Sequence, residues 1–281
     1  MPGVAPPFFI LEIFMYLLSD ANSNTKLAKS SHQAKGAGFR IWDLSLRPAT
    51  GSGYNVCEYS TPTCRALCCV DAVGHGNRKS VQDARDRKTR RLFRDRLGFL
   101  EDLHADLSKA VTLAARDGEE PIVRLNVGSD QPWEDIDPRI FDHPATFYDY
   151  SKVRTRFAKT LPDNYFLTYS HNEKTPHGFS ESLLRRGVNV AVVFDTLYLP
   201  RFNRIGNLPK TWRRHKIVDG DKHDLRLPRF DGRGNVVGLR AKGGHDAIIE
   251  GVAKGFIVRT RNGVISSLIG NRKVQSSKGR A

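Results

Sequence analysis

Short stretches of alternating apolar and polar residues run through most of the chain and predict half-buried β-strands. Residues 39–46 alternate with a period of two, and further strands are predicted at 122–127, 145–150, 165–170, 188–194 and 235–240. Short helical segments fit between some of these strands, at 139–142 and 180–186. Strands that alternate with helices in this way predict an α/β fold with a parallel sheet.

An apolar stripe with helical spacing occupies residues 81–115 and predicts a helical segment in two pieces. The first half also carries a run of cations, among which Arg85, Lys88 and Arg91 are candidate contacts to nucleic-acid phosphates. The alternative is a solvated outer face, the usual role of such a run. The stripe consists of Leu92, Phe93, Leu97, Leu100, Leu103, Leu107, Val111 and Ala114.

Polar residues follow the carboxyl ends of the predicted strands. In a parallel sheet that closes, or nearly closes, into a barrel, such residues meet at one rim and form the site. We therefore expect a complete or partial (βα) barrel with parallel strands. The residues expected on the rim are Cys57, Ser129, Asp130, Lys152, Ser170 and Asp195.

The barrel-like domain is expected at 39–258, between an N-terminal extension and strap at 1–38 and a basic C-terminal segment at 259–281. The basic segment has no acidic residue, and its end is expected to be disordered. The apolar run at 8–18 contains Glu12 and is too short to span a bilayer, so no membrane partner is expected. Met15 is a second candidate start beside Met1.

The chain is strongly basic. Its 281 residues include 45 Lys and Arg against 30 Asp and Glu, which gives a formal net charge of +15. Such an excess favours a polyanionic partner, and nucleic acid, either DNA or RNA, is the expected one. No GxxxxGK[ST] loop and no strand-linked GxGxxG segment occurs, which argues against nucleoside-triphosphate and Rossmann dinucleotide binding.

All four cysteines lie in one segment of thirteen residues, at Cys57, Cys64, Cys68 and Cys69. Clustering favours a local metal site over scattered disulfides, and it indicates the reducing cytoplasm, that of the host if the chain is phage-encoded. Three interpretations remain open. The cysteines hold an iron–sulfur cluster, they form a structural zinc site that His75 could complete, or they are buried thiols.

Several segments resemble, in the same order, those of a family of phage and prophage proteins. The resemblance covers about residues 17–243, and its segments read NVCEYSTPTCRALC, VQDARDRKT, RLNVGSDQPWE, FYDYSK, NVAVVF and VVGLRAKG. More loosely, a strand followed by a three-cysteine loop and βα units resembles the radical-SAM superfamily. The cysteine spacing here is C-x6-C-x3-C, whereas the common spacing of that superfamily is C-x3-C-x2-C.

The radical-SAM resemblance implies a partial barrel with a 4Fe-4S cluster on Cys57, Cys64 and Cys68. In that superfamily the fourth iron is left open and binds the methionyl part of SAM. The usual glycine-rich, acidic motif for the SAM amine is replaced here, at best, by Gly128-Ser129-Asp130. Under this resemblance, Ser129 and Ser170 are the candidate cofactor-binding residues.

Three polar residues at predicted strand ends are the candidate catalytic groups. Asp130 could act as a general base, a SAM ligand or a nucleophile, or it caps the turn that Pro132 sets. Lys152 could hold a phosphate or carboxylate, and Asp195 is a second carboxylate at a strand end. The segment 219–224, DGDKHD, is rich in possible ligands, although such a segment is often only a turn.

Together these patterns favour a phage-type enzyme that acts on nucleic acid or a nucleotide, with an iron–sulfur cluster on the cysteine loop. A second hypothesis is a barrel transglycosylase that exchanges a base in DNA or tRNA, with Asp130 and Asp195 as base and nucleophile. A third is a basic nucleic-acid-binding protein whose cysteines hold a structural zinc.

Overall fold

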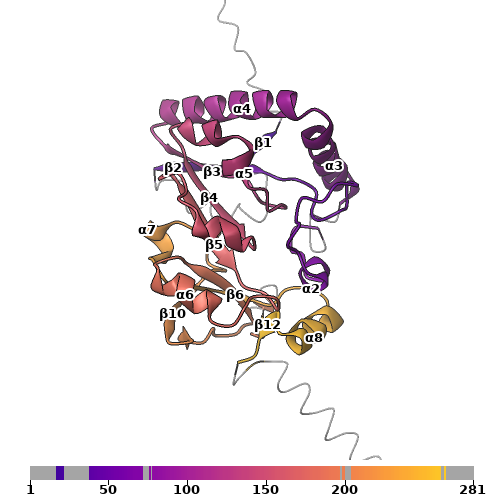
Figure 1. Cartoon of the computed structure of the whole chain (residues 1–281), viewed down its shortest axis with the longest axis vertical. Helices are drawn as coiled ribbons and strands as arrows, with labels where there is room; N and C mark the ends of the chain where they lie inside the picture. Colours follow the sequence, from indigo (N-terminus) through magenta and orange to yellow (C-terminus); the bar gives the residue numbers. More distant parts are fainter. Residues whose placement is uncertain are drawn as a thin grey trace, which may run out of the picture.

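The structure is a computed structural model that describes residues 17–21, 38–71, 76, 78–196, 198–199, 204–260 and 263. It is a mixed α/β fold built on a ten-stranded, mostly parallel sheet (Figure 1). The predicted α/β class is therefore confirmed. His75 and most of the predicted segments 1–38 and 259–281 lie outside the described residues.

Seven neighbouring strands of the sheet are parallel, and the first five follow the order of the chain. Antiparallel strands form the two edges, and the path through the described strands runs from one edge to the other without closing. The parallel strands are β2 (Phe39–Leu44), β3 (Glu120–Arg124), β4 (Thr146–Ser151), β5 (Tyr165–Ser170), β6 (Val190–Phe194), β11 (Val236–Arg240) and β10 (His215–Asp219). The edge strands are β1 (Leu18–Asp20) and β9 (Thr211–Trp212). A further strand, β12 (Ile257–Val258), pairs with β6. A separate two-stranded sheet consists of β7 (Tyr198–Leu199) and β8 (Arg204–Ile205).

The predicted two-piece helix is present as α3 (Lys79–Arg94) and α4 (Arg96–Arg116). Asp95 separates the pieces because its carboxylate caps α4, where it accepts a hydrogen bond from the Gly98 amide at 3.1 Å. The other helices are α2 (Pro62–Ala66), α5 (Trp133–Ile136), α6 (Phe179–Arg185), α7 (Pro228–Asp231) and α8 (His245–Lys254), with short 3-10 helices η3 (Pro138–Asp142) and η4 (Arg154–Ala158).

The alternation in β2 sends its side chains into the cores on both faces of the sheet. Trp42 and Leu44 join the core that includes Phe99 of α4, and Ile41 joins the core that includes Tyr148. In Figure 1, α4 lies along one end of the molecule, above β1, β2 and β3. Leu97 was predicted on the apolar stripe but is 79% exposed, because it lies in the first turn of α4, away from the packed face.

The residues before β2 also contribute to the sheet. Residues 19–38 were predicted as a loop or strap, but Leu18–Asp20 form the edge strand β1. Its start is fixed by the buried carboxylate of Asp106 on α4, which accepts hydrogen bonds from the amides of Leu17 and Leu18 at 2.7 and 3.0 Å. Because the pattern of 18–20 is too short to show a period, the sequence did not predict this strand.

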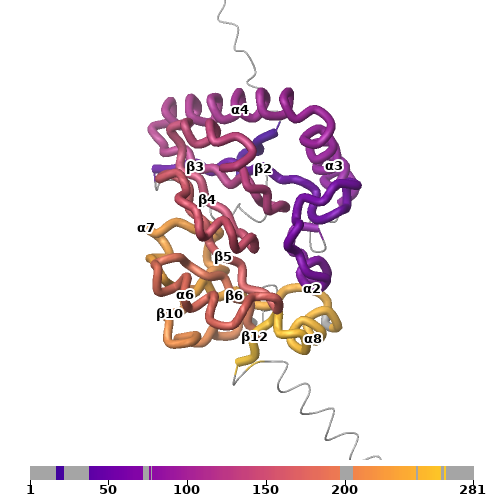
Figure 2. The backbone as a smooth tube through the Cα atoms, in the orientation of Figure 1, coloured from indigo at the N-terminus to yellow at the C-terminus, as the bar shows by residue number. Residues whose placement is uncertain are grey.

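The cysteine loop between β2 and α3 lies at the carboxyl ends of the parallel strands. Figure 2 shows α2, which belongs to this loop, beside α8, although the two helices are far apart in the sequence. Cys64 and Leu67 of the loop pack against a small core formed by Ala241, Val252 and other residues next to α8. The loop is thereby held over one edge of the sheet, where the candidate site lies.

Candidate functional site

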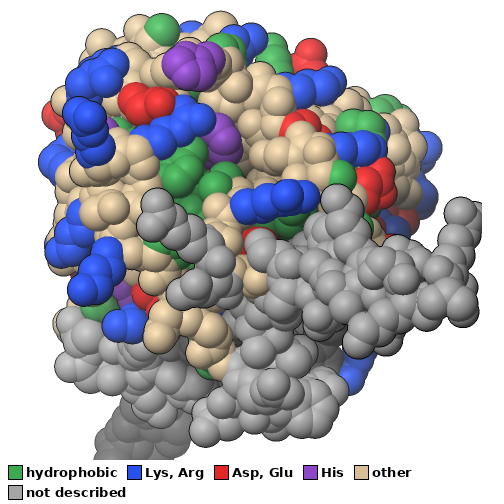
Figure 3. Space-filling model, turned by 90° about the horizontal axis from the view of Figure 1, so that it is seen from below, with side chains coloured by type: hydrophobic (Ala, Val, Ile, Leu, Met, Phe, Trp, Pro, Cys, Tyr) green, Lys and Arg blue, Asp and Glu red, His purple; other side chains and the backbone are tan. Residues whose placement is uncertain are grey.

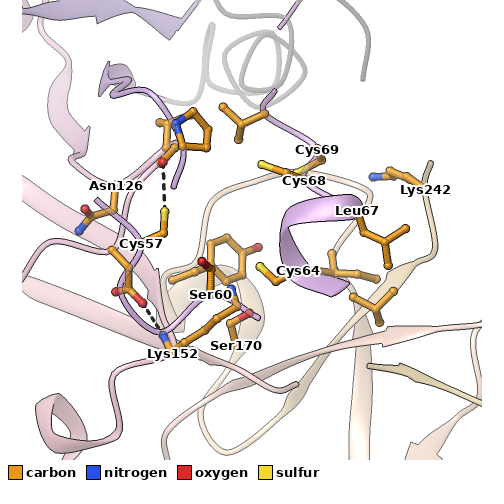
Figure 4. A pocket seen from close by; sticks show the side chains of 18 of the residues that line it. Cys57, Ser60, Cys64, Leu67, Cys68, Cys69, Asn126, Lys152, Ser170 and Lys242 are labelled. Atoms are coloured by element: carbon orange, nitrogen blue, oxygen red, sulfur yellow. Dashed lines mark hydrogen bonds between the residues drawn. The ribbon is translucent and has the colours of Figure 1, made fainter. Parts of the chain in front are cut away.

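A cavity of about 390 Å³ lies between the cysteine loop and the carboxyl ends of the parallel strands (Figure 4). Its volume falls within the range of small-molecule sites, and ligands bind at this edge in open α/β sheets. Seven of the sequence-predicted residues line it, namely Cys57, Cys64, Cys68, Ser129, Asp130, Lys152 and Ser170. The remaining predicted rim residue, Asp195, does not line it.

Cys57 is fixed by its neighbours in the loop. The buried Val56 precedes it, and the Val56 carbonyl accepts a hydrogen bond from the Asp130 amide at 2.8 Å. The Cys57 thiol donates a hydrogen bond to the carbonyl of Gly128 at 3.4 Å. The loop after β2 is thereby tied to the loop after β3, and Cys57 lies between them (Figure 4).

Cys64 and Cys68 are positioned by the short helix α2. Pro62 and the N-cap residue Thr61 begin the helix, and the Thr61 hydroxyl accepts a hydrogen bond from the Cys64 amide at 3.0 Å. Cys68 follows the helix, and Cys69 beside it is exposed. None of the four cysteines forms a disulfide, and all four line the same cavity.

The buried thiols resist ionisation. Burial raises the pKa of Cys57 to about 11, although a backbone hydrogen bond and the nearby Lys152 pull it down. Burial also raises the pKa of Cys68, and the neighbouring Cys69 adds to that rise. A metal ion that binds these thiols would have to displace their protons, as thiolate ligands require.

The donor set suits a thiolate-bound metal or cluster, because three free cysteines of one loop face one cavity. In their present positions, the described residues contain no group of three or more His, Cys, Asp or Glu side chains that could hold a metal ion together. Cys57 and Cys68 flank α2, which carries Cys64, so their convergence on one ion requires the loop to rearrange around α2.

Lys152 supplies a positive charge at the end of β4. Its buried position alone would lower the pKa of the ammonium group. Cys64, Asp130 and Cys57 together outweigh burial and hold the Lys152 pKa above its ordinary value. Lys152 therefore stays a cation in the cavity at neutral pH and favours anionic groups, thiolates included.

The carboxylate of Asp130 is held by contacts within the protein. One carboxylate oxygen accepts a hydrogen bond from the Lys152 amide at 2.7 Å, and the other lies 3.2 Å from the Arg156 guanidinium. Arg156 is buried and also makes two contacts of 2.7 Å with Glu134. Asp130 therefore fixes the backbone that carries Lys152, a role that differs from the predicted cap of the turn at Pro132.

Asp195 faces away from the cavity, at the end of β6. One of its oxygens accepts hydrogen bonds from the Thr260 amide at 2.7 Å and from the Thr260 hydroxyl at 2.8 Å. The chain after β12 therefore binds this carboxylate. The structure does not bring Asp130 and Asp195 together as the two cavity carboxylates that the transglycosylase hypothesis requires.

Ser129 belongs to a buried polar network beneath the cavity. Its hydroxyl donates to Asn126 at 2.7 Å, and the Asn126 amide donates in turn to Asp149 at 3.1 Å. Burial raises the pKa of Asp149 to about 7, although Arg124 and the Asn126 backbone oppose this rise. Ser170, at the end of β5, lines the cavity directly. The network fixes the Ser129 side chain at the cavity wall.

A second wall of the cavity contains charged residues that the sequence patterns did not single out as a site. Arg124 is buried, pairs with Asp224, and lies 5.0 Å from the centre of the Tyr150 ring. Arg240 is paired with Asp221 at 3.0 Å, and Lys242 with Asp221 at 2.6 Å. The DGDKHD segment was a weak signal for this wall, but Arg124 lies inside a strand, where no strand-end rule could find it.

The three cations predicted on α3 are committed to internal contacts. Arg85 donates to the Val70 carbonyl at 2.8 Å, and Lys88 donates to the Leu17 carbonyl at 2.6 Å. Burial lowers the pKa of both side chains. Arg91 pairs with Asp102 and lies 3.6 Å from Asp95. These contacts tie α3 to β1, to the cysteine loop and to α4.

The fold and the site define a mixed α/β protein with a cysteine-lined cavity at the carboxyl edge of a mostly parallel sheet. The chain belongs to the Gene product 88 family, whose model matches residues 16–260. This is a phage-type family, so the resemblance to phage and prophage proteins is confirmed, whereas the comparisons lend no support to the resemblance to the radical-SAM superfamily. No curated protein and no solved structure matches the chain. Within the described residues, every helix is too short or too polar to cross a membrane.

Proposed function

We propose that this chain is a phage-type enzyme that acts on a nucleic acid or a nucleotide, with an iron–sulfur cluster on Cys57, Cys64 and Cys68. One observation carries the proposal. Three free cysteines of a single loop line the same ligand-sized cavity as the strand-end residues Lys152 and Ser170. A chain that used these cysteines only for packing would not need them around one cavity with a half-buried cation.

The order of the strands supports the proposal. β2 to β6 are neighbours in chain order and parallel, and the cysteine loop follows the first of them. We infer that these strands, with β11, form a partial (βα) barrel, in which catalytic groups gather at the carboxyl ends. The Gly128-Ser129-Asp130 segment follows β3, the second of these strands, where the radical-SAM resemblance expects a cofactor-binding motif.

The residues of the cavity have separate roles in this proposal. A 4Fe-4S cluster, when bound, supplies single electrons, which SAM cleavage requires. Lys152 offsets negative charge on the thiolates or on a bound phosphate. Ser129 and Ser170 offer hydroxyl groups for hydrogen bonds to cofactor or substrate. Leu67, Phe256 and other apolar lining residues exclude water from the same space.

The two other hypotheses receive less support from the geometry. Base exchange needs two carboxylates at one sugar, whereas Asp195 binds Thr260 outside the cavity and Asp130 is engaged by Arg156. A structural zinc site needs four ligands, and His75, the candidate fourth ligand, lies outside the described residues. The cysteines also lie beside a cavity, whereas structural zinc sites are closed.

Iron and sulfide analysis of protein purified without oxygen tests the proposal. We expect about four irons and four sulfides per chain, with a broad absorption band near roughly 400 nm. Cys57→Ser, Cys64→Ser and Cys68→Ser should each lower the iron content and change the spectrum. Cys69→Ser is the matched control, because Cys69 is exposed and adjacent to a predicted ligand.

Two results would contradict the proposal. The first is protein that holds neither iron nor sulfide even after anaerobic reconstitution. The second is an iron content that the Cys69→Ser variant loses as completely as the Cys57→Ser variant does. Stoichiometric zinc without iron would instead support the structural zinc hypothesis.

A further inference from the structure

The strands β9 and β10 form a hairpin at the edge of the sheet with an unusual turn. His215 pairs with Trp212 and Lys216 with Thr211, so the turn consists of Arg213 and Arg214 alone. Their φ angles are +48° and +70°. Two consecutive positive φ angles define a type I′ turn, for which Asn and Gly are the preferred residues.

Arginine is a costly choice at both positions. An L side chain with a Cβ is disfavoured in the left-handed region, and two such residues in a row add their costs. Among the described residues, Ala49 is the only other non-glycine residue with a positive φ. Strain of this kind persists where another demand outweighs it, which here points to a need for two guanidinium groups at the tip.

The hairpin is basic around its turn, and its acidic residue, Asp219 at the far end of β10, pairs with Arg240. Segment 210–218 contains Lys210, Arg213, Arg214 and Lys216 and no acidic residue, and these four side chains are exposed. Figure 3, which views the molecule from the end that carries β10, α6 and α8, shows Lys and Arg side chains gathered along one side of that face. The hairpin therefore presents positive charge to a partner.

The two arginines differ in how they are held. The Arg213 guanidinium lies 4.5 Å from the centre of the Trp212 ring and pairs with Glu181 on α6 at 2.5 Å. Arg214 makes no hydrogen bond or ion pair with any residue that the structure describes. One side chain is thus preorganised by the protein, and the other is available to an external anion.

The geometry points to duplex DNA as the partner, and we propose that the β9–β10 hairpin enters its major groove with Arg213 and Arg214 at the tip. The major groove of B-DNA admits a two-stranded β-ribbon, whereas the deep, narrow major groove of duplex RNA does not. Single strands are recognised by exposed aromatic rings, but Trp212 is half-buried between Arg213 and His171.

This inference rests on the proposed action on nucleic acid and names the form of nucleic acid that is bound. Its test is independent of the cluster. The binding of a short fluorescent DNA duplex is measured by anisotropy, over about 50 to 200 mM salt, for the whole chain and for Arg214→Gly. Glycine suits a positive φ, so this variant should fold at least as well as the parent, which thermal unfolding checks.

In this arrangement the Arg214 guanidinium contacts a backbone phosphate at the edge of the groove, and loss of that one contact should weaken binding about eight-fold at about 0.1 M salt and lower the salt slope by about 0.9. Arg214→Lys should retain most of the affinity. Arg116→Ala removes an exposed cation of α4 and should leave the affinity unchanged. Among the described residues, the ion-pair partner of Arg116 is the neighbouring Asp117. Figure 1 places α4 at the end of the molecule opposite β10.

Equal effects of Arg214→Gly and Arg116→Ala would overturn the inference, and so would the absence of duplex binding by the parent chain. Tighter binding to single-stranded DNA or duplex RNA of the same length would overturn the groove assignment. Protein without iron that binds duplex DNA through Arg214 would contradict the cluster proposal alone. If the protein holds a cluster but its affinity for DNA does not change in Arg214→Gly, this inference alone would be contradicted.

Discussion

Arg156 is the residue whose removal should affect the cavity most strongly from outside it. Its side chain is only 1% exposed and donates to Glu134 twice at 2.7 Å, to Asp130 at 3.2 Å and to the Tyr165 hydroxyl at 2.8 Å. Arg156→Met would leave two carboxylates without their buried cation. Removal of one partner from a buried ion pair destabilises proteins by about 3–5 kcal/mol, and we expect a loss of about 4 kcal/mol here.

Urea unfolding at neutral pH measures this loss as a change in the free energy of unfolding. Arg154→Met is the matched control, because Arg154 is exposed in the same short helix, η4, and its loss should cost less than about 0.5 kcal/mol.

A double-mutant cycle with Glu134→Gln separates the ion pair from simple packing. If Arg156 and Glu134 act as one pair, the two single losses should not add, and their coupling energy should be about 2 kcal/mol or more. Additive losses would refute this reasoning, and so would an Arg156→Met variant as stable as Arg154→Met. The first result would show that Arg156 and Glu134 are not energetically coupled, and the second that neither Asp130 nor Glu134 depends on the buried cation for stability.

Two further predictions concern the cysteine loop. Because burial raises the pKa of Cys57 to about 11, its thiolate is scarce at pH 8. Iodoacetamide should therefore alkylate the exposed Cys69 first and Cys57 only as the pH rises. Peptide mass spectrometry that finds Cys57 modified first would contradict this prediction. Gly128→Ala should destabilise the protein by about 2 kcal/mol or more, because an added Cβ would lie 2.4 Å from the Leu46 carbonyl. Gly118→Ala is the control for Gly128→Ala. A Cβ at position 118 would meet open space, so the smaller loss of stability there should come only from the φ angle of +68°. Equal losses of stability in the two variants would contradict the steric argument.

The strands at the centre of the sheet were predictable because they are apolar segments of five or six residues, such as VAVVF in β6, followed by polar residues. β10 and α8 were not predicted, since His215–Asp219 mixes polar and apolar residues and α8 lies between glycines. Tertiary packing decides α8: Gly251 lets Leu67 and Ile257 approach to within about 3 Å of where a Cβ would be. A local sequence pattern does not reveal such a contact between distant segments.

The strand-end rule found most of the cysteine wall of the cavity but only part of the whole. It succeeded for Lys152 and Ser170 because parallel strands end at one edge. It failed for Asp195, since the partner that turns this carboxylate away, Thr260, follows a strand that was not predicted. The rule did not identify Arg124 because this arginine lies inside a strand. Its burial depends on the ion pair with Asp224, which is far away in the sequence.

One strand links the cavity to the proposed DNA contact. β10 begins next to the turn of Arg213 and Arg214 and ends at Asp219, which clamps Arg240 at the cavity wall at 2.7 Å. Its five residues span roughly 17 Å, so a duplex on the hairpin would lie within about one helical turn of the cavity. Enzymes that act on a base in a duplex take that base out of the stack. If the two proposals hold, a hairpin fixed to the cavity wall by Arg240 would suit this chemistry, because it would keep the duplex at a set distance while one nucleotide left it.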